Sequence, residues 1–192
     1  MAQERTLLGL LTSSLVVIGL LSWRVYTDKQ AIERLGTKAQ QRTATRLERG
    51  VSVPDLAGST LNDTTPRVHF QDQPFPVVLY VFTAGCKWCT RNLDGFRALR
   101  DQLRGRYAIY GVALSRFNLD EYLNVHAMNV PIITNLSDET ITAFGFRSTP
   151  ETIVVSREGR VLEVWAGVYT GLVKDDIEAT LHVRLPSLER AE

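Results

Sequence analysis

The sequence predicts an α/β domain with a central mixed sheet, helices on both faces of that sheet and an apolar segment near the N-terminus. Three observations support this prediction: two apolar, β-favouring runs separated by a helical stripe, a later strand–turn–strand pattern, and a stretch without charge at residues 7–23. At 192 residues and 44% hydrophobic, the chain is long enough to bury one core. We therefore expect one globular domain with an appendage.

The appendage is Leu7–Trp23, LLGLLTSSLVVIGLLSW, an uncharged segment between Arg5 and Arg24. At about 1.5 Å per residue, a helix of this length approaches the roughly 30 Å of a bilayer core. Such uniform apolarity is unusual in a small soluble domain, and no A-x-A pattern follows the segment. We predict an uncleaved single-pass transmembrane anchor over residues 1–27. A cleaved signal peptide and a buried helix are the alternatives.

Residues 28–52 are polar and mostly helix-favouring, with a cation at every fourth position from Arg34 to Arg46. This spacing predicts a helical, basic juxtamembrane linker. The linker is either a solvated spacer or a surface that contacts anionic headgroups or subunits of a membrane complex. The cations that follow the apolar segment favour a cytoplasmic domain, although long folded domains translocate largely regardless of this bias.

The domain is predicted over residues 53–185, after a loop-rich entry at Gly50–Thr65, and residues 186–192 form a C-terminal tail. The predicted strands share apolar, β-branched runs and are Pro76–Phe82, Tyr107–Leu114 and the two arms of a hairpin at 152–156 and 161–168. The segment Ile132–Thr134 is too short to assign. The predicted helices are Cys89–Arg104, Asn118–Met128 with Asn118 as its cap, Asp138–Phe144 and Gly171–Val183.

The order of these elements predicts parallel strands joined by right-handed crossovers, followed by an antiparallel hairpin. The end of Pro76–Phe82 then lies at the carboxyl edge of the sheet, where chemistry is usually found in open α/β folds. The only two cysteines of the chain, Cys86 and Cys89, follow this strand directly. We expect a sharp turn there, which Gly85 allows.

A helix that starts at Cys86 offers unpaired N–H groups and a dipole that stabilise a thiolate. The pKa of Cys86 is therefore expected below the free value of about 8.5, with a modest contribution from Lys87. Cys89 lies one turn further into the helix and is more sheltered. This asymmetry predicts that Cys86 attacks a disulfide of a protein substrate and that Cys89 resolves the mixed disulfide.

A structural zinc site and two inert buried thiols are the alternatives for this pair. Zinc needs four nitrogen or sulfur ligands, whereas His69, His126 and His182 are scattered without paired spacing. A CxxC that follows a buried strand in a βα unit instead favours redox chemistry. We expect no metal and no organic cofactor. The net charge of +1 also argues against a nucleic-acid partner.

A strand is followed by GCKWC at 85–89 and a helix, and STP at 148–150 comes later, before a hairpin and a last helix. In the order of these motifs, the chain resembles the thioredoxin superfamily. The closest branch is the membrane-tethered, extracytoplasmic thiol–disulfide oxidoreductases of the TlpA/ResA kind, with redoxin and AhpC/TSA relatives alongside. The resemblance covers Val53–Val183. It implies a thioredoxin-like three-layer fold, protein thiol or disulfide substrates, and a domain in the periplasm, tethered to a bacterial inner membrane.

The resemblance also implies a cis peptide bond at Thr149–Pro150, facing the cysteines. In such proteins this segment presents backbone to the substrate chain and keeps metals away from the thiols. Trp88 is expected either to line the substrate groove or to pack on the surface beside it. Two departures concern proton transfer: Tyr80 stands where thioredoxins have a buried Asp, and Asn92 where many ResA-like proteins have Glu. Water, Tyr80 or Glu151 is the candidate group for the proton transfer that these carboxylates perform in the family.

Two other functions are weighed against this prediction. The segment TAGC, Thr83 to Cys86, matches the TxxC of peroxiredoxins, in which the threonine hydroxyl supports a peroxidatic thiolate, but Leu79 stands where that motif has proline. Alternatively, the chain is a non-catalytic accessory subunit of a membrane complex, with idle thiols. The CxxC spacing favours dithiol exchange over both.

Overall fold

The computed structural model describes residues 47–61, 67–146 and 148–188, all of which belong to the unit Thr45–Glu192. The predicted anchor over 1–27 and the four regularly spaced cations of the linker lie outside the described residues. Within the described ranges, no helix combines the length and the apolarity needed to cross a membrane.

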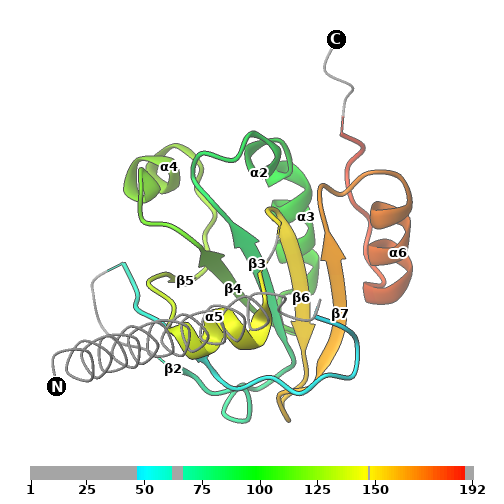
Figure 1. The fold of residues 1–192 in the computed structure, drawn as a ribbon. Coiled ribbons are helices and arrows are strands. Elements are labelled where there is room, and N and C mark those ends of the chain that lie inside the picture. Colours follow the sequence, from blue (N-terminus) through cyan, green and yellow to red (C-terminus); the bar gives the residue numbers. More distant parts are fainter. Residues whose placement is uncertain (1–46, 62–66, 147, 189–192) are drawn as a thin grey trace, which may run out of the picture. The chain divides into compact units, whose positions relative to one another are not determined.

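Five strands form the central sheet in the order β5-β4-β3-β6-β7 (Figure 1). Strands β3 and β4 are parallel, as are β4 and β5, whereas β6 and β7 run antiparallel to their neighbours. The predicted mixed sheet is therefore confirmed. The strand bounds are β3 Val77–Phe82, β4 Ala108–Ala113, β5 Ile132–Ile133, β6 Glu151–Val155 and β7 Val161–Ala166.

Strand β3 is buried on both faces, and its alternating side chains enter two different cores. Val78, Tyr80 and Phe82 belong to the core formed with α3 (Leu93–Leu103), α4 (Leu119–Val125) and α6 (Gly171–Leu181). Val77, Leu79 and Val81 belong to the core that contains Phe144 of α5 (Asp138–Phe144). Helices therefore cover both faces of the sheet, as the sequence predicted.

The single helix predicted over Cys89–Arg104 is instead two helices, α2 (Lys87–Arg91) and α3, which meet at Asn92. The Asn92 N–H donates to the carbonyls of Trp88 and Cys89 at 3.0 and 3.1 Å, and its own carbonyl accepts from the Phe96 N–H at 2.9 Å. The Asn92 side chain makes no capping bond, because it is buried and accepts a hydrogen bond from the Tyr169 N–H. The break was not predicted, since the apolar stripe continues through it.

Asn118 is the N-cap of α4, as the sequence predicted, but it caps the helix through its backbone. Its backbone is left-handed, with φ of 54°, and its side chain makes no capping hydrogen bond. Asparagine tolerates this conformation better than most residues. The helix begins there through the Asn118 carbonyl, which accepts from the Tyr122 N–H at 3.0 Å.

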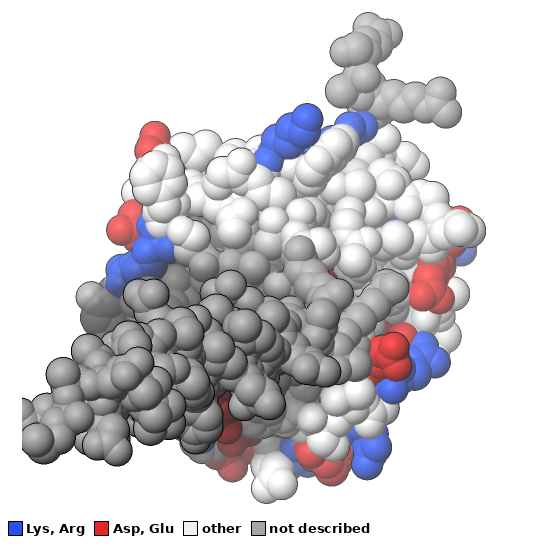
Figure 2. Space-filling model, viewed as in Figure 1, with Lys and Arg blue, Asp and Glu red and all other residues white. Residues whose placement is uncertain are grey.

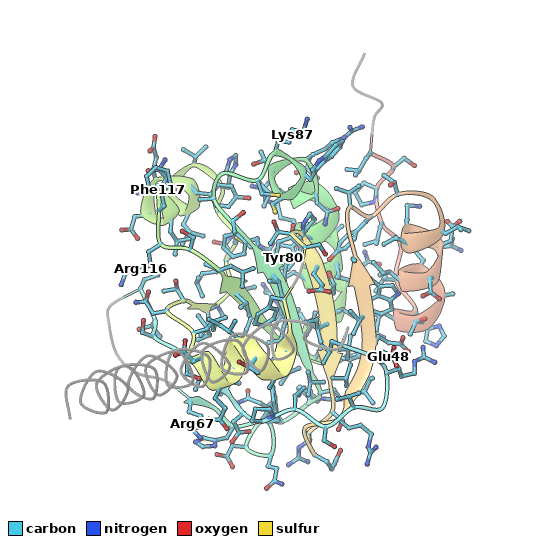
Figure 3. The ribbon with its side chains drawn as sticks, viewed as in Figure 1. Glu48, Arg67, Tyr80, Lys87, Arg116 and Phe117 are labelled. Atoms are coloured by element: carbon cyan, nitrogen blue, oxygen red, sulfur yellow. The ribbon has the colours of Figure 1, made fainter. Side chains whose placement is uncertain are left out.

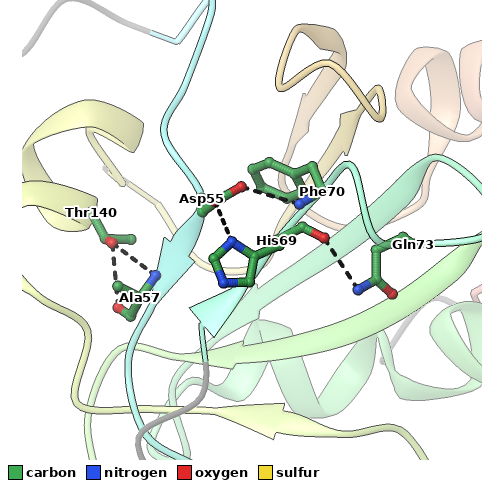
Figure 4. A network of polar contacts seen from close by, with 6 residues as sticks. All are labelled: Asp55, Ala57, His69, Phe70, Gln73 and Thr140. Atoms are coloured by element: carbon green, nitrogen blue, oxygen red, sulfur yellow. Dashed lines mark hydrogen bonds and ion pairs between the residues drawn. The ribbon is translucent and has the colours of Figure 1, made fainter.

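Two short strands that the sequence did not predict, β1 (Leu56–Ala57) in the loop-rich entry and β2 (Arg67–Val68) just after it, pair antiparallel. Side chains fix this small sheet (Figure 4). The Asp55 carboxylate contacts His69 Nδ1 at 2.7 Å and accepts from the Phe70 N–H at 3.1 Å. The Ala57 N–H donates to Thr140 Oγ1 of α5 at 3.1 Å. Two-residue strands are too short for alternation to be visible in a sequence.

Residues 47–52 fall within the predicted linker, and the structure packs them on the domain. Leu47 is buried in the same core as Val77 and Phe144. The Gly50 N–H donates to the Val161 carbonyl, and the Val161 N–H donates to the Val51 carbonyl, each at 2.8 Å. The ordered packing of the domain therefore begins before residue 53.

Candidate active site

Cys86 lies at the carboxyl edge of the sheet, where it follows the end of β3 at Phe82 and is the N-cap of α2. Its backbone is extended, with φ of −86° and ψ of 105°. The Cys89 N–H donates to Cys86 Sγ at 3.1 Å, so the sulfur takes the place of a capping oxygen. The Cys86 N–H donates to the Thr83 carbonyl at 3.2 Å. The predicted position of the pair at a strand-to-helix junction is thus observed.

The turn into α2 does not require glycine at position 85. Gly85 is exposed, its φ lies outside the left-handed region, and a Cβ added there would meet no atom within 4 Å. The expected conformational role of Gly85 is therefore wrong, because the chain makes this turn with backbone angles that any residue adopts.

The two thiols lie in different environments. Cys86 is partly exposed, whereas Cys89 is fully buried in the core beside α3. Burial raises the pKa of Cys86, but hydrogen bonds from the Cys89 and Thr149 side chains and from backbone N–H groups of α2 outweigh it, so the pKa is lowered overall. Burial, and then the hydrogen bond with Cys86, raise the pKa of Cys89 to about 12. One thiol is thus prepared to ionise and the other is held protonated.

Thr149 and Pro150 come to the cysteines from a distant part of the chain. The peptide bond between them is cis, as the resemblance implied. The Cys86 thiol donates to the Thr149 carbonyl at 3.4 Å, so backbone of this segment faces the reactive sulfur. The Pro150 carbonyl accepts from the Gly167 N–H at 2.8 Å, which ties the segment to the end of β7.

A layer of neutral polar groups lies beneath Cys89. The Tyr80 hydroxyl donates to the Cys89 carbonyl at 3.5 Å, and Asn92 Nδ2 donates to the Tyr80 hydroxyl, also at 3.5 Å. Asn92 Oδ1 accepts from the Tyr169 N–H at 2.8 Å, and the Tyr169 hydroxyl shares a 2.6 Å hydrogen bond with Thr152. Burial raises the pKa of both tyrosines, so both stay neutral.

The sequence identified Tyr80 and Asn92 as departures from the family pattern but missed Tyr169 and Thr152. Thr152 lies directly opposite Tyr80 in the β3–β6 register, so the two side chains share a face of the sheet. Glu151 is one residue earlier and therefore lies on the opposite face from Tyr80 and the cysteines. The candidate proton-transfer role of Glu151 is not supported by this placement.

Trp88 and Lys87 lie at the surface beside Cys86. Trp88 is 47% exposed, which is high for a tryptophan. Lys87 Nζ lies 5.0 Å from the centre of the Trp88 ring, and the guanidinium carbon of Arg91 lies 5.6 Å from it. Lys87 points outward at the upper edge of the molecule in Figure 3. Trp88 is thus available to a partner and is not part of the core.

Thr83 contacts both cysteines through its backbone. Its carbonyl accepts from the Cys86 N–H, and its backbone lowers the pKa of Cys89.

Across the described ranges, no group of three or more His, Cys, Asp or Glu side chains is arranged to hold a metal ion.

A cavity of about 270 Å³ adjoins the turn on the side of α4, lined by Ala84, Asn118, Glu121, Tyr122, Val125 and His126. The Tyr122 ring stacks on Phe82 at 5.6 Å and contacts His126 edge-on at 4.6 Å. Its buried hydroxyl makes no hydrogen bond in the structure. The turn that leads from β3 to Cys86 therefore borders this cavity through Ala84.

Comparison with known proteins supports this description of the fold. The sequence model of the AhpC/TSA family matches residues 50–164. A solved structure assigned as the thiol:disulfide interchange protein DsbE from Chlorobium tepidum aligns with a TM-score of 0.60 at 16% identity, covering 71% of this chain and 96% of that one.

Two further solved structures align over a similar span. The thioredoxin domain of a thiol-disulfide oxidoreductase from Bacteroides vulgatus gives a TM-score of 0.56 at 20% identity, covering 71% of this chain and 96% of that one. StoA from Bacillus subtilis gives 0.53 at 14% identity, with 68% and 99% covered. A comparison with curated proteins finds no significant match. At these identities the likeness shows a thioredoxin-like fold.

Proposed function

The chain belongs to the AhpC/TSA family within the thioredoxin superfamily, and on this premise we propose that it is a thiol–disulfide oxidoreductase that acts on protein substrates through Cys86 and Cys89. One observation carries the proposal: a partly exposed thiol of lowered pKa caps α2 at 3.1 Å from the N–H of a buried second cysteine. This arrangement separates an attacking sulfur from a resolving one.

The proposed reaction has two steps. The Cys86 thiolate attacks one sulfur of a substrate disulfide, a bond forms between Cys86 and that sulfur, and the other substrate sulfur leaves as a thiolate that takes a proton from solvent. Cys89 then loses its proton to solvent and attacks Cys86 Sγ, which releases the second substrate thiolate. The substrate gains two electrons, and the cysteine pair becomes a disulfide. The reverse sequence oxidises a substrate dithiol.

The surrounding residues have proposed roles in binding and ionisation. The backbone at Thr149 and Pro150 faces Cys86 and offers main-chain groups to an extended substrate segment. Trp88, two residues after Cys86, offers an exposed apolar surface to the same substrate segment. The Cys89 and Thr149 side chains and the N–H groups of α2 lower the pKa of Cys86. We propose lesser tuning roles for Lys87, which follows Cys86 in the chain, and for Thr83, whose backbone lowers the pKa of Cys89.

The second part of the proposal concerns location. We propose that Leu7–Trp23 anchors the chain in a bacterial inner membrane as a single span, with the domain in the periplasm, and that the basic linker contacts headgroups or complex subunits. The uncharged sequence of this segment and the thiol chemistry support the proposal. Fusing a periplasm-dependent reporter or a cytoplasm-dependent reporter to the C-terminus tests it. Activity of the cytoplasmic reporter alone would reject it.

Reduction of insulin disulfides by dithiothreitol tests the catalytic proposal. The wild-type protein should accelerate the reaction, Cys86→Ser should abolish the acceleration, and Cys89→Ser should trap a mixed disulfide through Cys86. Hydrogen peroxide consumption by the same three proteins tests the peroxidase alternative. Equal insulin reduction by wild type and Cys86→Ser would overturn the proposal and favour an assembly role in a membrane complex.

A further inference from the structure

The exposed side of α2 concentrates positive charge and aromatic surface beside the reactive thiol. Lys87, Trp88 and Arg91 form what we call the cationic rim. Both cations lie over the indole ring, at 5.0 and 5.6 Å from its centre. Lys87 follows Cys86 directly in sequence, so a substrate cysteine bonded to Cys86 necessarily lies near this rim.

Helix stability does not explain this choice of residues. Lys87 is the first residue of α2, at the positive end of the helix dipole, where a cation is unfavourable. Lys87 and Arg91 are four residues apart, and like charges at this spacing repel each other. Contact with Trp88 offsets part of this cost. A sequence selected for helix stability alone would favour an acidic first turn, but α2 has no acidic residue there.

The opposite side of the reactive turn carries the other sign of charge. Asp120 and Glu121 begin α4, and Glu121 lines the cavity next to Ala84. Asp94, at the start of α3, is paired with Arg97 at 2.8 Å. Lys87 forms no ion pair with any residue that the structure describes. Figure 2 shows blue atoms over α2 and red atoms over α4, with largely uncharged surface between them.

We propose that the cationic rim selects substrate segments that carry an acidic side chain within one or two residues of the attacked cysteine. The proposal rests on the thiol–disulfide exchange proposed above and names the substrate class of that site. An acidic side chain at this position pairs with Lys87 and Arg91, while apolar atoms of the same segment contact Trp88.

The charge pairing also assists the chemistry. An acidic neighbour disfavours the thiolate form of the attacked substrate cysteine, which makes that cysteine a poorer leaving group in the second step, when Cys89 attacks Cys86 Sγ. In the complex the two cations neutralise the acidic neighbour, so the thiolate released in that step forms more easily. A basic neighbour would instead be repelled by the rim. Because Lys87 is exposed and Arg91 is partly exposed, salt should weaken this discrimination.

Three disulfide peptides of one sequence, with Glu, Gln or Lys next to the attacked cysteine, test the inference. For the wild-type chain at low salt, the rate constant of reaction with reduced Cys86 should be highest for the Glu peptide. It should exceed that of the Lys peptide by roughly 3- to 30-fold, the factor expected of two ion pairs at the protein surface. The ratio should fall toward one in 1 M sodium chloride, where the Debye length is about 3 Å.

The variant with Lys87→Glu and Arg91→Glu should reverse the order of the peptides. The matched control is Arg104→Glu, which changes an exposed cation after the far end of α3, about 16 Å along that helix. It should keep the wild-type order. Equal rates for the three peptides, or an unchanged order in the double variant, would overturn the inference.

Binding of unreactive peptides separates this inference from the proposed function. Peptides in which serine replaces the cysteines are labelled, and their affinity for the full chain is measured by fluorescence anisotropy. Tighter binding of the Glu peptide, lost in the double variant, supports the rim even if no peptide is reduced. Absence of reduction for all peptides, with this binding order intact, would reject the catalytic proposal alone. Equal affinities would reject the rim.

Discussion

Cys86 and Cys89 are three residues apart, and their surroundings push their pKa values in opposite directions. Burial raises both values, but the free N–H groups at the start of α2 and the Thr149 side chain reach Cys86, so its pKa ends lower than usual. Cys89 lies in the core, and its pKa rises to about 12. The CxxC spacing places the two cysteines close together, and their different exposure makes Cys86 the proposed attacking sulfur and Cys89 the proposed resolving one.

The pH dependence of alkylation by iodoacetamide should report the ionisation of Cys86, because the thiolate is the reactive form. The rate should rise with pH and reach half its maximum at a lower pH than for an unperturbed thiol, because the pKa of Cys86 is lowered. Thr149→Ala removes a hydrogen bond that stabilises the thiolate, so the midpoint should move to higher pH and the rate at neutral pH should fall severalfold. Thr90→Ala, an exposed change on the same helix, is the control.

The same shift has a consequence for stability. Because folding lowers the pKa of Cys86, its thiolate stabilises the reduced fold above the unfolded-state pKa, and this contribution is lost as the pH falls through the folded-state pKa. The free energy of unfolding of the reduced wild type, relative to Cys86→Ser, should therefore rise with pH across this window. A flat difference would contradict the lowered pKa.

Asn92 should be more important for stability than Tyr80. Asn92→Leu leaves the buried Tyr169 N–H without its 2.8 Å partner, and an unpaired buried donor costs about 1–3 kcal/mol. Tyr80→Phe removes two hydrogen bonds of 3.5 Å, near the limit of such bonds, and keeps the ring stacked on Phe96. We expect a loss below about 1 kcal/mol for Tyr80→Phe. Urea unfolding of both variants measures the difference, and a larger loss for Tyr80→Phe would contradict this ranking.

At the scale of elements, α2 is a five-residue helix that begins with a local cap and ends at a tertiary contact. Cys86 begins it through a sulfur that accepts a hydrogen bond, and Asn92 ends it with a side chain that turns into the core. So short a helix is not stable by itself in water. The packing of β3 and α3 therefore holds the reactive cysteine in position.

Two glycines test whether the lack of a side chain is needed for close packing of the backbone. A Cβ at Gly58 would meet the Thr134 carbonyl and Ile133 Cγ2, both at 2.7 Å, where the chain after β1 pairs with the chain after β5. Gly58→Ala should lower the free energy of unfolding by roughly 1–3 kcal/mol, since backbone must move. Gly85→Ala meets open space and should leave both stability and insulin reduction nearly unchanged. Thermal unfolding of both variants measures this, and a loss of activity in Gly85→Ala would contradict it.

For the molecule as a whole, the segment after α6 completes the core on the α3 side of the sheet. Val183 and Leu185 are 4% and 6% exposed and belong to the same core as Cys89. The Gln102 side chain bonds the N–H and the carbonyl of Arg184, at 2.8 and 2.6 Å. The segment at 183–185 is thereby attached to the helix that follows the reactive pair.

Truncation after His182 should therefore destabilise the domain by roughly 3–6 kcal/mol, because it removes two buried side chains worth about 1.5–3 kcal/mol each. Truncation after Pro186 keeps both and should cost less than about 1 kcal/mol. Urea unfolding of the two shortened proteins compares these costs. Equal stability of the two would show that the segment at 183–185 contributes little to the core.

The local pattern of the sequence was sufficient to predict most elements. Strand β3, helix α3 and the hairpin β6–β7 are long or strongly periodic, so their apolar spacing predicts them, whereas the short helix α5 was predicted from its SDET start. Strands β1 and β2, the break at Asn92 and the left-handed Asn118 were missed or misassigned. Each of these depends on a contact with a segment distant in the chain, or on a backbone angle that a residue pattern does not specify.

By itself, the sequence determined the order of the longer strands and helices, the position of Cys86 and Cys89 after a buried strand and, through the family pattern, the cis bond at Pro150. Only the tertiary structure decided which groups surround the sulfurs: the Thr149 carbonyl from 63 residues away, the neutral layer around Asn92, and the exposure of Trp88. The reason is physical. Hydrophobic periodicity indicates which side of a helix or strand is buried. Hydrogen bonds, pKa values and exposure instead depend on distances between elements that are far apart in the sequence and meet only in the folded structure.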